Sequence, residues 1–139
     1  IEECKERLQE SADRKEIKIE VEGSPLVFET TKPILEEVVY NLMDNAIKYN
    51  REQGNVTVRI FRKEKQFGFS VKDTGIGIPL IHQDRIFERF YRVDKSRSKE
   101  IGGTGLGLSI VKHGVSCLGA QISVDSIPDE GSTFTVTWG

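Results

Sequence analysis

The order in which helical and strand patterns follow one another is the feature that most constrains how this chain can fold. Apolar residues at helical spacing predict helices over 1–15, about 31–50, 80–90 and about 105–118. Alternating apolar residues predict strands over 17–21, 26–28, 56–61, 67–71, 120–126 and 133–138. Strands joined by short turns, with helices between the strand groups, indicate an α+β sandwich in which a mixed sheet carries helices on one face.

The length and charge of the chain exclude several classes of protein. A chain of 139 residues favours one compact domain. No run approaches the roughly 18 apolar residues of a membrane span, and the net charge of −2 argues against a free-standing nucleic-acid-binding module. We therefore expect neither nucleic-acid binding nor direct membrane contact. Because the chain starts at Ile1 and its only methionine is Met43, we also expect it to be a piece of a longer protein.

The second predicted helix carries a polar stripe beside its apolar one. Asn41, Asn45, Lys48 and Tyr49 are spaced so that they share one helix face. A solvated helix face would explain this pattern. A ligand face would explain it too, because amide oxygens suit magnesium, lysine suits phosphate, and an aromatic ring can pack against a base or sugar.

Glycines are concentrated in two segments that flank a basic one. The run 102–107 opens directly into a helix, where amide N–H groups and the helix dipole can hold phosphate, although a structural turn is the alternative. Leu108 and Ser109 replace the lysine and hydroxyl of a P-loop, and Leu108 stands where a dinucleotide fingerprint has its third glycine. Six basic and two acidic residues give residues 85–99 a net charge of +4, which fits either a solvated surface or a mobile lid over an anion.

Four separated motifs, taken together, resemble the catalytic ATP-binding domain of bacterial sensor histidine kinases. They are an asparagine box at 41–49, a glycine box at 73–79, a phenylalanine box at 86–92 and a second glycine box at 103–108. The closing Gly131-Ser132-Thr133-Phe134 fits the last hairpin of that family. The resemblance covers about residues 17–138 and extends to the wider GHKL group of gyrase-type ATPases, heat-shock chaperones, histidine kinases and mismatch-repair ATPases.

The resemblance implies a Bergerat-type ATP-binding fold. This fold is a two-layer α/β sandwich with a mixed, mostly antiparallel sheet of about five strands, covered on one face by about three helices. The resemblance also implies two parts, namely a catalytic ATP-binding domain over 16–139 and a helix over 1–15 that connects it to a dimerisation domain outside the sequence.

The resemblance assigns roles around a bound nucleotide. Asn45 would hold Mg²⁺, Asn41 would face the triphosphate and its metal, and Lys48 would contact phosphate. Tyr49 would line the adenine or ribose side, and Asp73 would accept a hydrogen bond from the adenine amino group. Arg92 joins Asn41, Asn45 and Lys48 as an implied catalytic residue. Further ATP contacts are implied for Gly75, Gly77, Ile78, Lys95, Arg97, Gly103, Thr104, Gly105, Leu106, Gly107 and Ser132.

Kinases and ATPases of this group differ at one position of the asparagine box. Hydrolysing relatives carry a glutamate four residues before the magnesium asparagine, where this chain has Asn41, an amide that cannot act as a base. Histidine kinases phosphorylate a histidine on a separate helical domain, and neither His82 nor His113 has the sequence context of that acceptor. The implied activity is therefore transfer of the γ-phosphate of Mg·ATP to a histidine outside this sequence.

The resemblance also implies partners and a location. The partners would be the histidine-containing dimerisation domain of the parent kinase and the receiver domain of a response regulator. The domain would be cytoplasmic, and the parent protein would be anchored in the bacterial cell membrane. Two alternatives stay open. One is a nucleotide-binding module that has lost its activity. The other is a different GHKL kinase, such as an anti-sigma serine kinase, against which the phenylalanine box and the lid sequence argue.

Overall fold

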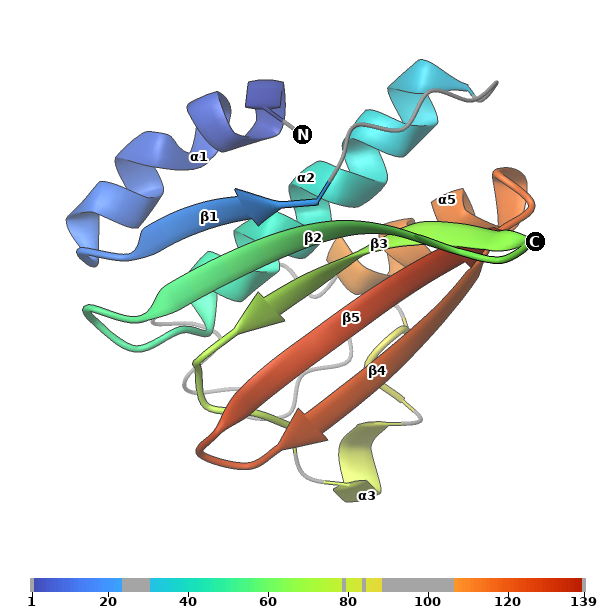
Figure 1. Ribbon diagram of the computed structural model, residues 1–139. Coiled ribbons are helices and arrows are strands. Elements are labelled where there is room, and N and C mark those ends of the chain that lie inside the picture. The colour runs from blue at the N-terminus through green and yellow to red at the C-terminus, as the bar shows by residue number, and fades with distance from the viewer. Residues whose placement is uncertain (1, 24–30, 79, 84, 89–106, 139) are drawn as a thin grey trace.

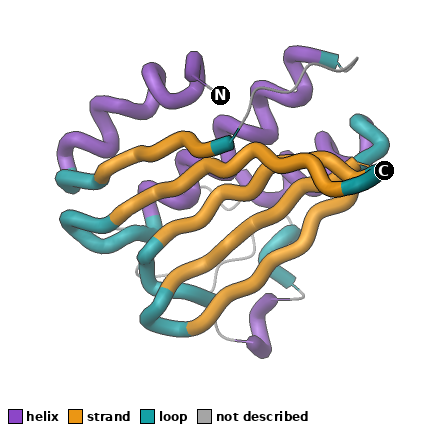
Figure 2. Tube along the Cα trace, in the orientation of Figure 1, coloured by secondary structure: helices purple, strands orange, loops and turns teal. Residues whose placement is uncertain are grey.

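The computed structural model describes residues 2–23, 31–78, 80–83, 85–88 and 107–138. The elements are α1 (Glu2–Arg14), β1 (Lys18–Glu22), α2 (Lys32–Lys48), β2 (Asn55–Lys63), β3 (Gln66–Asp73), α3 (Leu80–Gln83), α5 (Gly107–Cys117), β4 (Gln121–Ile127) and β5 (Gly131–Trp138). Figure 1 shows one twisted sheet with α2 and α5 behind it, and Figure 2 shows the strands lying side by side. The predicted α+β class is confirmed.

The sheet has the strand order β1-β2-β3-β5-β4. Strand β1 pairs parallel with β2, and the other three neighbouring pairs are antiparallel. A parallel pair needs a long crossover, which α2 supplies, whereas the β2–β3 and β4–β5 hairpins close through short turns. The sheet is therefore mixed and mostly antiparallel, as the resemblance implies.

The core lies between one face of this sheet and the helices. Alternate side chains of the three central strands point into it, because successive strand residues face opposite sides of a sheet. Val71 of β3 lies between Val58 of β2 and Phe134 of β5, and all three side chains are buried. They pack into one cluster with buried residues of α2 and α5, and each such side chain contributes about 1.5–3 kcal/mol of burial energy.

Helix α5 approaches α2 closely because it carries a glycine at the contact. A Cβ atom at Gly114 would lie 2.7 Å from Cγ2 of Val38, a separation that packed atoms do not adopt. Gly114 and Val38 are both buried. This close contact fixes the start of α5, at Gly107, relative to the polar side of α2.

Helix α1 belongs to the same core. Cys4, Leu8 and Ala12 lie one turn apart and are buried together with Ile17 and Ile19, which begin the following strand region. The Sγ atom of Cys4 also donates to the carbonyl oxygen of Glu36 in α2 at 3.7 Å. The apolar stripe predicted for residues 1–15 therefore packs against α2.

The helix predicted over 80–90 is confirmed over Leu80–Gln83 and wrong over 85–88, which form a turn, while residues 84, 89 and 90 lie outside the described ranges. The N–H of Arg85 donates to the His82 carbonyl at 2.9 Å, and the N–H of Glu88 donates to the Arg85 carbonyl at 3.0 Å. Bonds that span three residues are typical of turns rather than of an α-helix. The turn buries Ile86 and brings the ring of Phe87 edge-on to that of Phe134, 6.3 Å between centroids. Packing of these two apolar side chains on the core therefore overrides the helical pattern.

Helix α2 begins where the sequence predicts. Thr31 is the N-cap of α2, with a proline in the first turn, but its side chain makes no capping hydrogen bond. The predicted strand over 26–28 and the residues 105 and 106 expected to begin the last helix lie outside the described residues. Within the ranges that are described, no helix combines the length and the apolar character needed to cross a membrane.

Candidate functional site

The second half of α2 presents polar side chains on the side of the helix that is not buried. Asn41, Asn45 and Lys48 are half-buried, while the intervening Leu42 and Ala46 are buried in the core. This division follows from the helical period, because residues three and four positions apart share a face. The structure therefore brings Asn41, Asn45 and Lys48 together along one side of α2.

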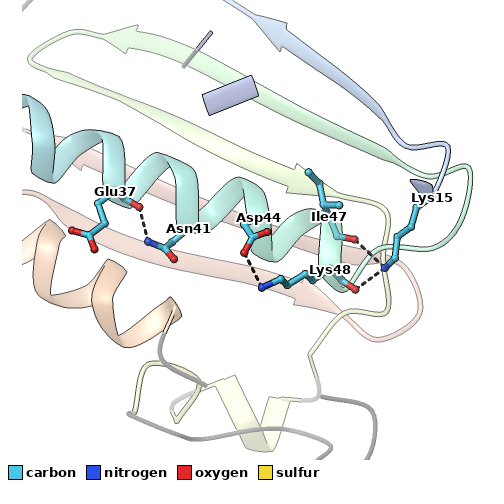
Figure 3. A network of polar contacts seen from close by, with 6 residues as sticks. All are labelled: Lys15, Glu37, Asn41, Asp44, Ile47 and Lys48. Atoms are coloured by element: carbon cyan, nitrogen blue, oxygen red, sulfur yellow. Dashed lines mark hydrogen bonds and ion pairs between the residues drawn. The ribbon is translucent and has the colours of Figure 1, made fainter. Parts of the chain in front are cut away.

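The hydrogen bonds of these side chains leave acceptor atoms available. Nδ2 of Asn41 donates to the Glu37 carbonyl at 2.8 Å, which directs the amide oxygen of Asn41 away from its own helix (Figure 3). A Cβ atom on Gly107, at the start of α5, would lie 3.5 Å from that oxygen. The described residues offer no hydrogen-bond partner to the side-chain amide of Asn45. Two amide oxygens on one helix face are thus free to bind a cation.

Lys48 is held by an ion pair within α2. Its Nζ atom lies 3.0 Å from Oδ2 of Asp44, one turn earlier in the helix (Figure 3). The two side chains are 38% and 21% exposed, so the pair is reachable by solvent and by a ligand. Sequence reasoning missed Asp44 as the partner of Lys48, although a carboxylate four residues before a lysine on a helix is a recognisable signal.

Asp73 is a buried carboxylate at the end of β3. It continues the inward alternation of Phe69 and Val71, so its side chain points to the face of the sheet that the helices cover. Its Oδ1 atom accepts hydrogen bonds from the N–H of Gly75 at 2.9 Å and from the N–H of Ser132 at 3.3 Å. Among the described residues none donates to Oδ2, and no buried side-chain oxygen or nitrogen there lacks a partner. Oδ2 is therefore accessible to an incoming donor.

Burial raises the pKa of Asp73 from 3.8 to about 6, and the two backbone N–H groups oppose this effect only in part. The carboxylate remains ionised at neutral pH. An ionised acceptor with one accessible oxygen in a water-poor site binds a neutral N–H donor strongly and rejects a carbonyl oxygen.

The loop after Asp73 is fixed against the end of α2. The N–H of Ile76 donates to the carbonyl oxygen of Tyr49 at 3.2 Å, and Oγ1 of Thr74 donates to Oδ1 of the buried Asn50 at 3.1 Å. The close approach requires a glycine at position 75, because a Cβ atom there would overlap the Tyr49 carbonyl oxygen and lie 2.9 Å from Oδ1 of Asp73. The backbone carbonyl of the half-buried Tyr49 is thereby held against the loop that follows Asp73.

The β4–β5 hairpin holds the far side of this loop. Ser126 Oγ accepts from the N–H of Ile78 at 2.7 Å and lies 2.7 Å from Oγ of Ser132. Gly77 has a φ of +70°, and the carbonyl of the preceding Ile76 accepts from the N–H of Asp129 at 2.8 Å. Sequence reasoning named Gly77, Ile78 and Ser132 but missed Ser126, whose role depends on a contact 48 positions along the chain.

The remaining predicted contacts fall mostly outside the part of the chain that the structure describes. Those outside it are Arg92, Lys95, Arg97, Gly103, Thr104, Gly105 and Leu106. Gly107 is described and begins α5 beside Asn41. His82 lies in the short helix α3 and is half-buried, whereas His113 lies in α5 and is exposed. The Nε2 atom of His113 is 3.6 Å from Sγ of Cys117.

The donor set suits magnesium better than a transition metal. Over the described ranges, no group of three or more His, Cys, Asp or Glu side chains is arranged to hold a metal ion. Mg²⁺ does not need such a cage, because it keeps several waters and binds through one or two protein oxygens together with phosphate oxygens. The accessible amide oxygens of Asn41 and Asn45 fit that mode of binding.

Comparison with known proteins agrees with this geometry. Residues 30–139 match the family described as "Histidine kinase-, DNA gyrase B-, and HSP90-like ATPase". The chain is 42% identical to the phosphate regulon sensor protein PhoR of Pseudomonas aeruginosa over 85% of its length, and 44% identical to the sensor histidine kinase WalK of Bacillus subtilis over 81%. It spans only 27% and 19% of those two relatives.

Solved structures give the same result. The mycobacterial sensor histidine kinase MprB is 31% identical, with a TM-score of 0.83 over 97% of this chain and 92% of that one. Full-length ShkA, solved in complex with AMPPNP, is 29% identical, with a TM-score of 0.80 over 98% of this chain and 28% of that one. The matched family, the shared fold and the polar site at the end of α2 and β3 lead to one conclusion: the chain belongs to the histidine kinase-, DNA gyrase B- and HSP90-like ATPase family, as a catalytic ATP-binding domain of the sensor histidine kinase type.

Proposed function

We propose that this domain binds Mg·ATP and transfers the γ-phosphate to a histidine on a separate dimerisation domain of its parent protein. The observation that carries the proposal is the buried Asp73, whose Oδ1 is occupied by two backbone N–H groups while Oδ2 stays accessible. An ionised acceptor of this kind suits the exocyclic amino group of adenine and disfavours guanine, which has a carbonyl at that position. The solved complex of its relative ShkA with AMPPNP, an ATP analogue, supports the adenine assignment.

The polar side of α2 would hold the other end of the nucleotide. Asn45 would bind Mg²⁺ through its amide oxygen, Asn41 would face the triphosphate, and Lys48 would leave Asp44 to contact phosphate. When bound, Mg²⁺ neutralises charge on the phosphate oxygens. Phosphoryl transfer depends mainly on such positioning and charge neutralisation. Tyr49 and Ser132 would line the base, with Gly75 and Gly77 allowing the loop to approach it.

The absence of a base at one position favours transfer to a histidine over hydrolysis. Asn41 stands four residues before Asn45, and its amide nitrogen already donates to a backbone carbonyl, so it cannot take a proton from water. The exposed Glu37 lies a further turn away on α2. Bound ATP would therefore keep its γ-phosphate until an external acceptor reaches it.

The whole-protein setting is proposed together with the function, and the likeness to sensor kinases supports it. The parent protein would be a sensor kinase with a histidine-bearing dimerisation domain, anchored in the membrane, with this domain in the cytoplasm. The onward acceptor would be the receiver domain of a response regulator. A structure that shares this fold, that of ThkA, was solved in complex with the response regulator protein TrrA.

The direct test is a phosphotransfer assay, done first with the wild-type domain and then with two variants. The domain is mixed with the dimerisation domain of the same parent protein and γ-labelled Mg·ATP, and we expect label on the histidine of the added domain only. Asn45→Ala should reduce the rate by at least about 100-fold, because the metal loses its protein ligand. Asn55→Ala, which changes an exposed asparagine at the start of β2, is the matched control and should retain the wild-type rate. Label on His82 or His113, or full transfer by Asn45→Ala, would contradict the proposal.

Lys48→Met should separate phosphate binding from stability. We expect Mg·ATP affinity, measured by titration calorimetry, to fall about tenfold, because one charge-assisted contact to phosphate is lost. The free energy of unfolding should change by less than about 1 kcal/mol, because the ion pair with Asp44 is partly exposed and reached by solvent. Lys18→Met removes a comparable exposed pair, with Glu20 at 3.3 Å on β1, and should change neither quantity. Unchanged affinity in Lys48→Met would show that Lys48 does not contact phosphate.

A further inference from the structure

Lys15, in the turn between α1 and β1, caps the C-terminal end of α2. Its Nζ atom donates to the carbonyl oxygens of Lys48 at 2.7 Å and Ile47 at 3.2 Å (Figure 3). It also donates to the carbonyl oxygen of Asn50 at 3.4 Å. The final carbonyls of a helix have no partner within the helix, and a positive charge there also interacts favourably with the helix dipole. One side chain thus satisfies the last turn of α2 from a segment 32 to 35 positions away in sequence.

The capped turn is the one that carries the proposed nucleotide residues. Asn45 and Lys48 lie in it and Tyr49 follows directly, with its N–H donating to the Asn45 carbonyl at 3.1 Å. The Tyr49 carbonyl in turn receives the N–H of Ile76 in the loop after Asp73. A change in the last turn of α2 would therefore move both the proposed phosphate contacts and the support of the adenine loop.

Helix α1 and the turn that follows it are held to α2 at three points with a nearly constant offset in sequence. Cys4 contacts the carbonyl of Glu36, the guanidinium carbon of Arg7 lies 4.2 Å from the centre of the Tyr40 ring, and Lys15 reaches Ile47 and Lys48. The offset is 32 or 33 residues in each case. The backbone of the corner is also fixed, because the N–H of Gln53 donates to the Lys15 carbonyl at 2.8 Å. Displacement of α1 along α2 would thus pull directly on the cap.

We propose that Lys15 is a positioning residue for the nucleotide site: by capping α2 from the α1–β1 corner, it sets the orientation of Asn45, Lys48 and Tyr49 and so couples Mg·ATP affinity to the placement of α1. Lys15 does not touch the nucleotide in this proposal and acts only through the end of α2. The inference rests on the proposed nucleotide site.

The test compares three variants of the full chain. Lys15→Met keeps the length of the side chain but cannot donate, and we expect it to weaken Mg·ATP binding about fivefold to tenfold. Lys15→Arg keeps the charge and several N–H donors, and it should restore affinity to within about twofold of the wild type. Ile122→Val serves as the matched control and should lower stability modestly. Ile122 lies on β4, which is the edge strand at the other end of the sheet from β1. This control variant should leave the affinity unchanged.

A second readout does not depend on nucleotide. Hydrogen exchange of the Tyr49 and Ile76 amides should accelerate in nucleotide-free Lys15→Met, and should stay near the wild-type rate in Lys15→Arg and Ile122→Val. Unchanged affinity in Lys15→Met would overturn this inference alone, with or without faster exchange. Equal losses in Lys15→Arg and Lys15→Met would overturn the capping explanation. A wild-type chain that binds no Mg·ATP would overturn the proposed function, and this inference with it.

Discussion

Asp73→Asn is expected to make the nucleotide-free domain more stable at pH 7.5 while it weakens Mg·ATP binding by about 100-fold or more. The amide oxygen of asparagine can still accept from the N–H groups of Gly75 and Ser132, so the local hydrogen bonds survive. The free-energy cost of burying a charge is removed, because the asparagine side chain is neutral. A pKa raised from 3.8 to about 6 corresponds to roughly 3 kcal/mol against the ionised native state, and we expect the variant to recover about 1–3 kcal/mol of this.

Binding changes in the opposite direction because the accessible atom changes its nature. The oxygen Oδ2 would be replaced by an amide NH₂ group, which is a donor facing the adenine amino donor. One charge-assisted hydrogen bond is lost and two donors are left opposed. Titration calorimetry with Mg·ATP measures the affinity. An affinity within about tenfold of the wild type would contradict the assignment of Asp73 to adenine.

The pH dependence of stability gives an independent check on the same residue. The folded pKa of Asp73 lies above the unfolded value, so the native state takes up a proton first as the pH falls. The contribution of Asp73 to stability therefore rises as the pH falls from about 6 to 3.8, and it is lowest above pH 6. Urea unfolding followed by the fluorescence of Trp138, the only tryptophan, gives this difference between wild type and variant. The advantage of Asp73→Asn should shrink over that window, and a constant difference would contradict the buried charge.

Gly75→Ala is expected to lower the free energy of unfolding by about 3 kcal/mol, because the new methyl group has no space. It would overlap the Tyr49 carbonyl oxygen and lie 3.0 Å from Cα of Asn50. Backbone atoms cannot move aside as a flexible side chain can. The loop must therefore separate from the end of α2 or strain it. We expect the melting temperature to fall by about 10 °C and Mg·ATP binding to be lost with it.

Gly119→Ala is the matched control, because alanine there costs stability through backbone strain and not through a steric clash. Gly119 has a φ of +70°, but no heavy atom lies within 4 Å of the place that a Cβ atom would take, so alanine there brings backbone strain of about 1 kcal/mol without a clash. Gly75 is not among the described glycines with positive φ. Calorimetric melting of both variants separates the two causes. An equal or smaller loss in Gly75→Ala would show that the loop yields easily.

The parts of the fold that could be predicted from sequence are those set by local periodicity. The alternation in β2 and β3 and the apolar stripe of α2 depend on neighbours within a few positions, and the polar stripe of Asn41, Asn45 and Lys48 follows from the same helical period. The end of α3 could not be predicted in this way, because Ile86 and Phe87 leave the helical pattern to pack on the core. Tertiary contact decided that segment.

The same distinction between local pattern and tertiary contact applies to the residues of the candidate site. Asp73 is identified by its place in a motif, but the sequence could not show that it is buried or that one oxygen stays accessible. Lys15 lies in a charged segment with no local distinction, and its role appears only when the α1–β1 corner meets the end of α2. Asn50, Thr74 and Ser126 are likewise ordinary polar residues, and the partners that tie them into the site lie 5 to 48 positions away.

The strand order has a consequence for the sequence of events in folding. Asp73 ends one hairpin, and Ser132 is the second residue of the last strand of the other. The hydrogen bond between them joins residues 59 positions apart. Each hairpin can form locally, whereas closing the long connection between them is entropically costly and late. The proposed adenine site is therefore completed when the two hairpins dock on each other. Docking of the hairpins would then limit the rate of folding, and a nucleotide bound across their contact afterwards would mainly slow unfolding.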